Sequence, residues 1–134
     1  MSYARQMLDS YRRSFNIDAG LLAATIDALN DCAQACTADV DADLGEQHVP
    51  ELIKCIRLCL DCADVCAATA TITSRLAEYD SKITKPLLEA CMATCRDCGH
   101  ECEQHSKMLE HCRVCAEACR RCELACQQLL AAMN

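Results

Sequence analysis

Apolar residues and cysteines recur every three or four positions along most of this 134-residue chain, a pattern that predicts amphipathic helices. Helix-breaking residues are few, with three Gly and two Pro, so the breaks between helices can be placed. The pattern predicts a short N-terminal helix within residues 1–15. Four longer helices are predicted over residues 18–40, 50–78, 84–105 and 107–132. The whole chain, 1–134, is expected to form a single domain.

The predicted helices are bounded by recognisable signals. Asn16 and Asp18 offer an N-cap to the first long helix, Pro50 fits the first turn of the second, and Ser106 is placed to cap the fourth. The stretch from residue 39 to residue 50 is interpreted as a loop. Because short connections make neighbouring helices antiparallel, the predicted fold class is all-α, an up-down-up-down four-helix bundle. The short extra N-terminal helix is expected to lie across one end or flank.

The cysteines follow the helical period. The stretches "CIRLCLDCADVC" (55–66) and "CMATCRDCGHEC" (91–102) both read CxxxCxxCxxxC, and "CRVCAEACRRCELAC" (112–126) continues the alternation of three and four. This spacing averages 3.5 residues and keeps the thiols on one stripe of each helix, here called the seam, which faces the interior of a bundle. Past the cysteines, Leu and Thr fill most seam positions. The thiols predicted to line the core are Cys32, Cys36, Cys55, Cys59, Cys62, Cys66, Cys91, Cys95, Cys98, Cys102, Cys112, Cys115, Cys119, Cys122 and Cys126.

Geometry and composition limit what these thiols do. A core of small cysteines alone would be underfilled, and voids are costly. Cβ atoms three or four residues apart on a helix are about 5–6 Å apart, whereas a disulfide needs about 3.5–4.5 Å. The N-terminus lacks the apolar region of a signal peptide, so a cytoplasmic chain with reduced thiols is expected. The net charge of −7 argues against nucleic acid, and no stretch is long enough for a membrane span.

A soft monovalent metal fits such a core. Thiolates select Cu(I), and bridging sulfurs at one Cu(I) per thiol give a neutral cluster, which favours about fifteen ions over about seven in a buried column. Two alternatives stay open: a thiol-redox protein, although no single exposed cysteine stands out, and a zinc- or cadmium-sequestering protein. No acid–base pair, nucleophile–base arrangement or phosphate loop is visible, so an enzyme is not expected.

The repeated CxxxCxxCxxxC on long helices, the missing leader and the turn that carries histidines resemble the cytosolic bacterial copper storage proteins. That resemblance implies a four-helix bundle that holds many Cu(I) ions through core cysteines, and a homotetramer. A copper chaperone or an efflux pump would then be a candidate partner. The first long helix departs from the fuller members of the family because it carries only Cys32 and Cys36, so a lower capacity is expected.

The two ends of the predicted bundle differ. One end continues the seams with Thr and Leu and is expected to be closed. The other carries His105 and His111, which we expect to be the first contacts of the incoming metal. Met108 is interpreted as core filler rather than a ligand, and His48 and His100 as solvated residues.

Overall fold

The computed structural model describes residues 2–12, 15–76 and 79–133. These ranges are helical without any strand, which confirms the predicted fold class. The elements are α1 (Tyr3–Asp9), α2 (Ala19–Leu44), the 3-10 helix η1 (Val49–Leu52), α3 (Ile53–Thr73), α4 (Ser81–His105) and α5 (Glu110–Ala132).

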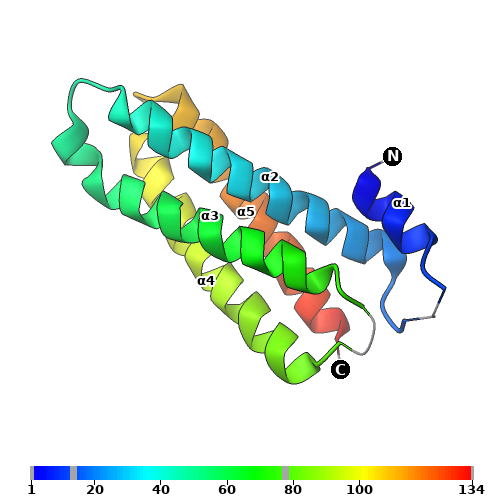
Figure 1. Ribbon diagram of the computed structural model, residues 1–134. Helices are drawn as coiled ribbons and strands as arrows, with labels where there is room; N and C mark the ends of the chain where they lie inside the picture. Colours follow the sequence, from blue (N-terminus) through cyan, green and yellow to red (C-terminus); the bar gives the residue numbers. More distant parts are fainter. Residues whose placement is uncertain (1, 13–14, 77–78, 134) are drawn as a thin grey trace.

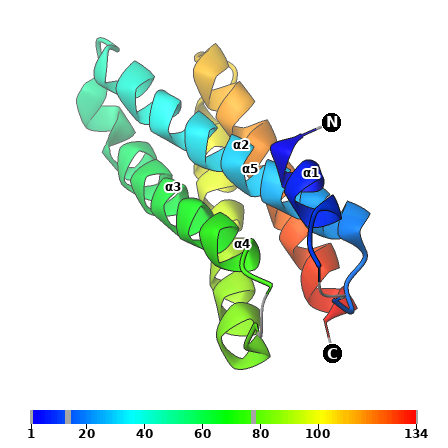
Figure 2. The ribbon, with the colours of Figure 1, turned by 45° about the vertical axis from the view of Figure 1, so that its right-hand side comes forward.

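The four long helices form an antiparallel bundle. Helix α2 packs against α3 and α5, and α4 packs against the same two helices, so the four close around one interior (Figure 1). The short α1 lies on the outside of α2, as the view from a second direction also shows (Figure 2). Across the described residues, no helix combines the length and apolar character that crossing a bilayer demands.

Several helix ends differ from the sequence expectation. Helix α1 ends at Asp9, and residues 1, 13 and 14 of the range predicted for it lie outside the described residues. Helix α3 ends at Thr73 rather than residue 78, and residues 77 and 78 also lie outside the described residues. Helix α4 begins at Ser81, three residues before the predicted 84, because the side chain of Asp80 caps it by accepting from the Lys82 N–H at 2.9 Å.

The two cap predictions have different outcomes. The Asp18 side chain accepts from the Leu21 N–H at 3.1 Å and caps α2, as predicted. The prediction for Ser106 was wrong, because this residue ends α4 and its hydroxyl donates to the Glu103 carbonyl at 2.7 Å. Helix α5 therefore begins at Glu110 rather than residue 107.

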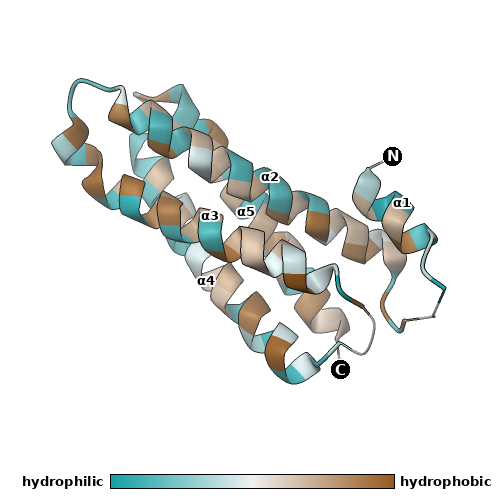
Figure 3. Cartoon of the chain, viewed as in Figure 1, coloured by the Kyte–Doolittle hydropathy of each residue, from teal (hydrophilic) through white to brown (hydrophobic). Residues whose placement is uncertain are grey.

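Cysteines fill the middle of the bundle interior. All fifteen are buried, each with no more than 1% of its surface exposed. Gly99 on α4 permits a close approach to α5, since a Cβ at this position would lie 3.4 Å from Cys119 Cβ and 3.2 Å from Arg120 Nε. Hydrophilic residues recur along the outward face of α2 and make up much of the loop that follows it (Figure 3). The usual apolar core of a helical bundle is thus replaced, over much of its length, by thiols.

Candidate metal centre

The fifteen buried cysteines form one continuous set of neighbouring sulfurs, here called the thiol column. All are free thiols. Contacts join different helices, with Sγ–Sγ distances of 3.5 Å for Cys59–Cys98 and 3.7 Å for Cys66–Cys95. Cysteines one turn apart also meet, as Cys62 and Cys66 do at 3.8 Å. The sulfurs are therefore close enough to share metal ions along and across the helices.

Four-sulfur groups overlap along the column. Within each group the sulfurs all lie within 4.8 Å of one another, and single cysteines such as Cys32, Cys36 and Cys119 belong to more than one group. Shared members favour bridging thiolates over separate tetrahedral sites. Four such groups are Cys32–Cys66–Cys95–Cys122, Cys32–Cys36–Cys62–Cys119, Cys36–Cys98–Cys115–Cys119 and Cys59–Cys98–Cys102–Cys115.

Hydrogen bonds between the thiols of the column lower the pKa of some cysteines and raise the pKa of others. Contacts with Cys119 and Cys32 lower the pKa of Cys62, although burial opposes this shift. Contacts with Cys122 and Cys32 raise the pKa of Cys95, and burial raises it further. A cation that binds the column must displace the protons that remain.

Two aspartates on α2 extend the seam beyond Cys36, and the sequence analysis missed both. Asp39 is 1% exposed and Asp43 is 0% exposed. They lie in the stretch interpreted as a loop, but α2 continues through it to Leu44. The spacing could have found them, because residues 36, 39 and 43 repeat the interval of three and four. We call the group Asp39, Asp43, His111 and Cys112 the carboxylate end of the column.

Asp39 connects the column to this end. Its Oδ2 accepts from the thiols of Cys55 at 3.7 Å, Cys59 at 3.4 Å and Cys102 at 3.6 Å. Its Oδ1 lies 2.5 Å from His111 Nδ1. Burial raises the pKa of the Asp39 carboxyl, while the hydrogen bond with His111 opposes the rise. One carboxylate therefore contacts three core thiols and the histidine that was expected to receive metal.

Asp43 lies one turn beyond Asp39, near the C-terminus of α2. Its Oδ1 is 3.6 Å from Cys112 Sγ and 3.4 Å from His111 Nδ1. Its Oδ2 is buried and has no hydrogen-bond partner within the described residues. Burial raises the pKa of Asp43 to about 7, and negative charge on Cys55 and Asp39 adds to the shift.

The two predicted histidines occupy different surroundings. His111 lies 3.7 Å from Cys112 Sγ through Nδ1 and 3.1 Å from Glu46 Oε1 through Nε2. Burial lowers the pKa of His111, but the hydrogen bonds with Asp39 and Glu46 outweigh it and leave that pKa raised. His105 is instead paired with Glu101, with 2.9 Å between Nε2 and Oε2. Of the two, His111 is the one that contacts the thiol column, through the sulfur of Cys112 and through Asp39.

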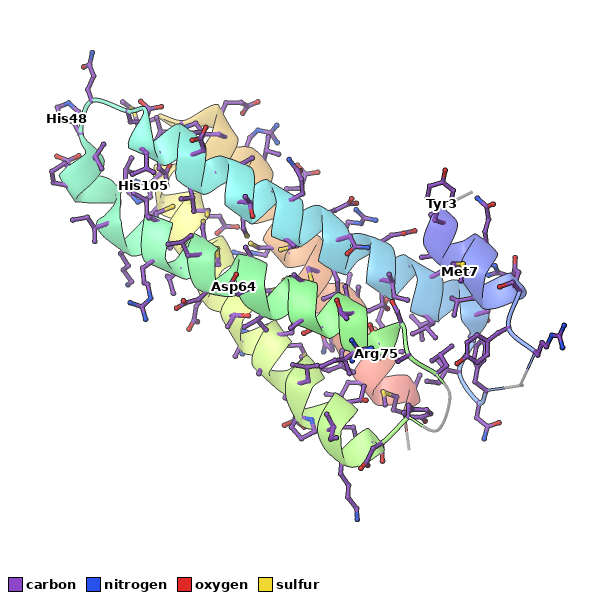
Figure 4. All side chains as sticks on the ribbon, in the orientation of Figure 1. Tyr3, Met7, His48, Asp64, Arg75 and His105 are labelled. Atoms are coloured by element: carbon purple, nitrogen blue, oxygen red, sulfur yellow. The ribbon has the colours of Figure 1, made fainter. Side chains whose placement is uncertain are left out.

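The other predicted residues of this end are exposed. His48 and His100 are exposed, as expected, and Figure 4 shows His48 at the same end of the bundle as His105. The core position expected for Met108 was wrong, because this side chain is 87% exposed. The reason is the helix start: α5 begins at Glu110, so Met108 belongs to the turn rather than to the seam.

The opposite end of the bundle is closed by apolar side chains, here called the apolar end: Leu22, Leu88, Leu129 and Met133, none more than 6% exposed. A cavity of about 10 Å³ remains between these helices, roughly the space of one water probe. Thr69, at 0% exposed, donates its hydroxyl hydrogen to the Val65 carbonyl at 2.6 Å, so its one donor is already used. Among the residues that the structure describes at this end, none of those that line the cavity is a cysteine or a histidine.

The interior of this helical bundle is lined by thiols, and one end is rich in carboxylate and imidazole. These features are typical of proteins that store thiophilic metal ions inside a helical bundle. The sequence profile of the Csp family, copper storage protein, matches residues 19–131. The chain belongs to the copper storage protein family, which confirms the resemblance stated from the sequence.

Solved structures and a curated relative agree with this assignment. The copper storage protein Ccsp from Streptomyces lividans, loaded with 10 copper equivalents, is 50% identical with a TM-score of 0.95, covering 97% of this chain and 99% of that chain. A structure of copper loading to a cytosolic copper storage protein from Streptomyces lividans (five coppers) is 54% identical with a TM-score of 0.84, covering 86% and 96%. The uncharacterised cysteine-rich protein YhjQ of Bacillus subtilis (strain 168) is 36% identical over 95 residues, 71% of this chain and 82% of that protein.

Proposed function

We propose that this chain stores Cu(I) in the cytoplasm by binding many ions through its core cysteine thiolates, at roughly one ion per thiol. The observation that carries the proposal is the overlap of the four-sulfur groups, since Cys32, Cys36 and Cys119 each serve more than one of them. Cu(I) accepts thiolate ligands readily, and shared sulfurs let neighbouring ions be held without a separate ligand set for each.

Charge supports the high loading. A Cu(I) ion held by two thiolates carries a net −1, and a column of such units would bury several uncompensated charges, which is costly. Equal numbers of Cu(I) and thiolate are neutral. The buried column should therefore favour bridged sulfurs and a capacity on the order of fifteen ions rather than about seven.

The ends of the bundle support a direction of uptake. Ions would arrive at the carboxylate end, with His111 and His105 as the first contacts, because apolar packing closes the other end. The role proposed is storage rather than catalysis. Assembly as a homotetramer, and exchange with a copper chaperone or an efflux pump, belong to the same proposal. The net charge of −7 does not favour a nucleic-acid partner.

Anaerobic titration of the reduced protein with Cu(I), against competing chelators, tests the proposal. We expect on the order of fifteen ions retained, with affinity falling at low pH because thiol protons must leave. A parallel titration with Zn(II) should saturate at fewer ions. Retention of only a few Cu(I) ions, or tighter retention of Zn(II) throughout, would refute storage of copper. Freshly purified protein with largely oxidised thiols would favour a redox role instead.

A further inference from the structure

The carboxylate end differs in chemistry from the rest of the thiol column. Around the Nδ1 atom of His111 the structure gathers two carboxylate oxygens and one sulfur. From this arrangement we propose a site for one divalent cation of borderline softness, Zn(II) being the representative ion, which shares Cys112 with the thiol column. Its ligands are Asp39, Asp43, His111 and Cys112.

The donor atoms already have nearly the spacing of a tetrahedral site. The distance from His111 Nδ1 is 3.4 Å to Asp43 Oδ1 and 3.7 Å to Cys112 Sγ. Cys112 Sγ lies 3.6 Å from Asp39 Oδ1 and 3.6 Å from Asp43 Oδ1. Tetrahedral Zn(II), with bonds of about 2.0 Å to N or O and about 2.3 Å to S, sets its ligand atoms about 3.3–3.6 Å apart. The hydrogen bond between Asp39 Oδ1 and His111 Nδ1, at 2.5 Å, has to open.

A third carboxylate, that of Glu46, orients the histidine. Glu46 Oε1 lies 3.1 Å from His111 Nε2, on the side of the ring away from Cys112. An Nε2–H that donates to Glu46 leaves the Nδ1 lone pair facing the two aspartates. Metal-binding histidines commonly donate their other ring N–H to a carboxylate in this way. Glu46 is therefore a positioning residue of the proposed site.

An unpartnered atom points independently to a ligand. Asp43 is 0% exposed, and its Oδ2 has no hydrogen-bond partner among the residues that the structure describes. A buried carboxylate oxygen without a partner is unfavourable. A cation bound beside Oδ1 would also lie within reach of Oδ2 and would compensate its charge.

Charge and ligand type favour a divalent ion over Cu(I) here. Two carboxylates and one thiolate carry −3 together, so a divalent ion leaves −1 in this buried place whereas Cu(I) leaves −2. Carboxylate oxygen, imidazole and a single thiolate together suit Zn(II), while Cu(I) prefers sulfur-rich sites. In the metal-free protein the carboxylate end thus suits a divalent ion, while Cu(I) that fills the column at one ion per thiol would compete for Cys112 and His111.

Anaerobic addition of Co(II), a spectroscopic substitute for Zn(II), to the reduced metal-free protein tests the site. We expect the first equivalent to show the visible bands of tetrahedral Co(II) with weak charge transfer from one thiolate, and Zn(II) to displace it. Asp43→Asn should weaken Co(II) binding at least tenfold. Asp41→Asn, exposed on the same helix, is the matched control and should leave it unchanged.

Several results would overturn the site. One is strong charge transfer typical of four thiolates at the first equivalent, with equal affinity in Asp43→Asn and Asp41→Asn. Another is the absence of Co(II) binding. If Asp43→Asn fails to give a folded helical protein by circular dichroism, Cys112→Ser replaces it, and the single-thiolate charge transfer should then vanish while the tetrahedral visible bands persist. Unchanged charge transfer in Cys112→Ser would refute the ligand assignment.

The site has a consequence that rests on the proposed copper store. A divalent ion would occupy His111, the expected first contact of Cu(I), so protein preloaded with one equivalent of Zn(II) should take up Cu(I) more slowly than metal-free protein. Asp43→Asn should remove that difference, and equal rates in the wild type would overturn the consequence. The two proposals fail separately, because Co(II) spectra report the divalent site whereas the Cu(I) titration of the wild type reports the column.

Discussion

The two ends of the bundle are equally buried but chemically opposite. At the carboxylate end, Asp39 and Asp43 continue the seam of α2 and are at most 1% exposed. At the apolar end, Leu88 and Leu129 occupy the equivalent inward positions of α4 and α5 with the same exposure. The helical period therefore determines which positions face inward. The type of residue at those positions determines whether an end offers apolar packing or polar ligand atoms.

The difference also separates stability from function. Buried leucines contribute favourable free energy through burial and close packing. Buried carboxyls cost free energy unless they are paired, and here one oxygen of Asp43 has no partner within the described residues. A protein that keeps such carboxyls in its core gives up stability at this end, where we propose that it binds ions. The predictions below test this division by changing one end at a time.

The largest effect is expected from Leu88→Ala at the apolar end. Leu88 is 0% exposed, and truncating a buried leucine destabilises proteins by about 2–5 kcal/mol through lost transfer free energy and a residual cavity. Urea unfolding of the reduced metal-free protein measures the loss. The matched control, Leu124→Ala, changes a leucine that is 54% exposed on α5 and should stay within about 0.5 kcal/mol. Similar losses in both variants would contradict the assignment of stability to the apolar end.

At the carboxylate end, we expect the free energy of unfolding to change with pH by about 1–3 kcal/mol. The pKa of Asp43 is raised from 3.8 to about 7 in the folded protein, so its favourable contribution is complete below about pH 4 and is lost as pH rises through about 7. The raised pKa of His111 acts in the same direction, its contribution fading as pH rises above 6.5. The ionisable groups that face this pair are Asp39, Glu46, Cys55 and Cys112.

Unfolding free energies measured between pH 4 and pH 8 under reducing conditions check this expectation. Stability should fall as pH rises, and the slope should be shallower in Asp43→Asn because the amide does not ionise. Asp41→Asn should keep the wild-type slope, since Asp41 is exposed. Identical slopes in the wild type and Asp43→Asn would show that this carboxyl does not set the pH dependence.

The fold and the thiol column could be predicted from sequence because both rest on local periodicity. Few residues break the helices, and the interval of three and four assigned all fifteen cysteines to the interior, where the structure has them. Asp39 and Asp43 were missed because charged residues close to Gly45 and Pro50 are typical of a loop. Both are buried against His111 of α5, a helix that is distant in the sequence but packs on α2. No local pattern encodes such a contact.

Turn chemistry explains the remaining errors. Ser106 was expected to begin a helix but ends one, and the turn that follows carries the chain to a new helix start at Glu110. A shift of this size removes Met108 from the seam and leaves it 87% exposed. Helix starts depend on cap and turn contacts of a few residues, so sequence places them less well than it places the seams.

A kinetic effect is expected when the two histidines at the carboxylate end are removed. In His105→Ala/His111→Ala, Cu(I) uptake should slow roughly fivefold, equivalent to about 1 kcal/mol in the barrier, because the first contacts are lost while the column is kept. Stopped-flow mixing with a Cu(I) donor measures the rate, and equilibrium titration should give nearly the wild-type capacity. His100→Ala, an exposed residue of α4, is the control. Uptake at the wild-type rate in the double variant would count against this entrance.

The smallest effect is expected from Thr69→Val, which changes a buried polar group at the apolar end without changing its shape. The Thr69 hydroxyl donates only to the Val65 carbonyl, at 2.6 Å, so stability should change by less than about 1 kcal/mol. Cu(I) uptake should be as fast as in the wild type, because the hydroxyl is not on the proposed route. Slower uptake in Thr69→Val, measured by the same stopped-flow experiment, would mean that ions also pass the apolar end, and the contrast between the two ends would then concern packing alone.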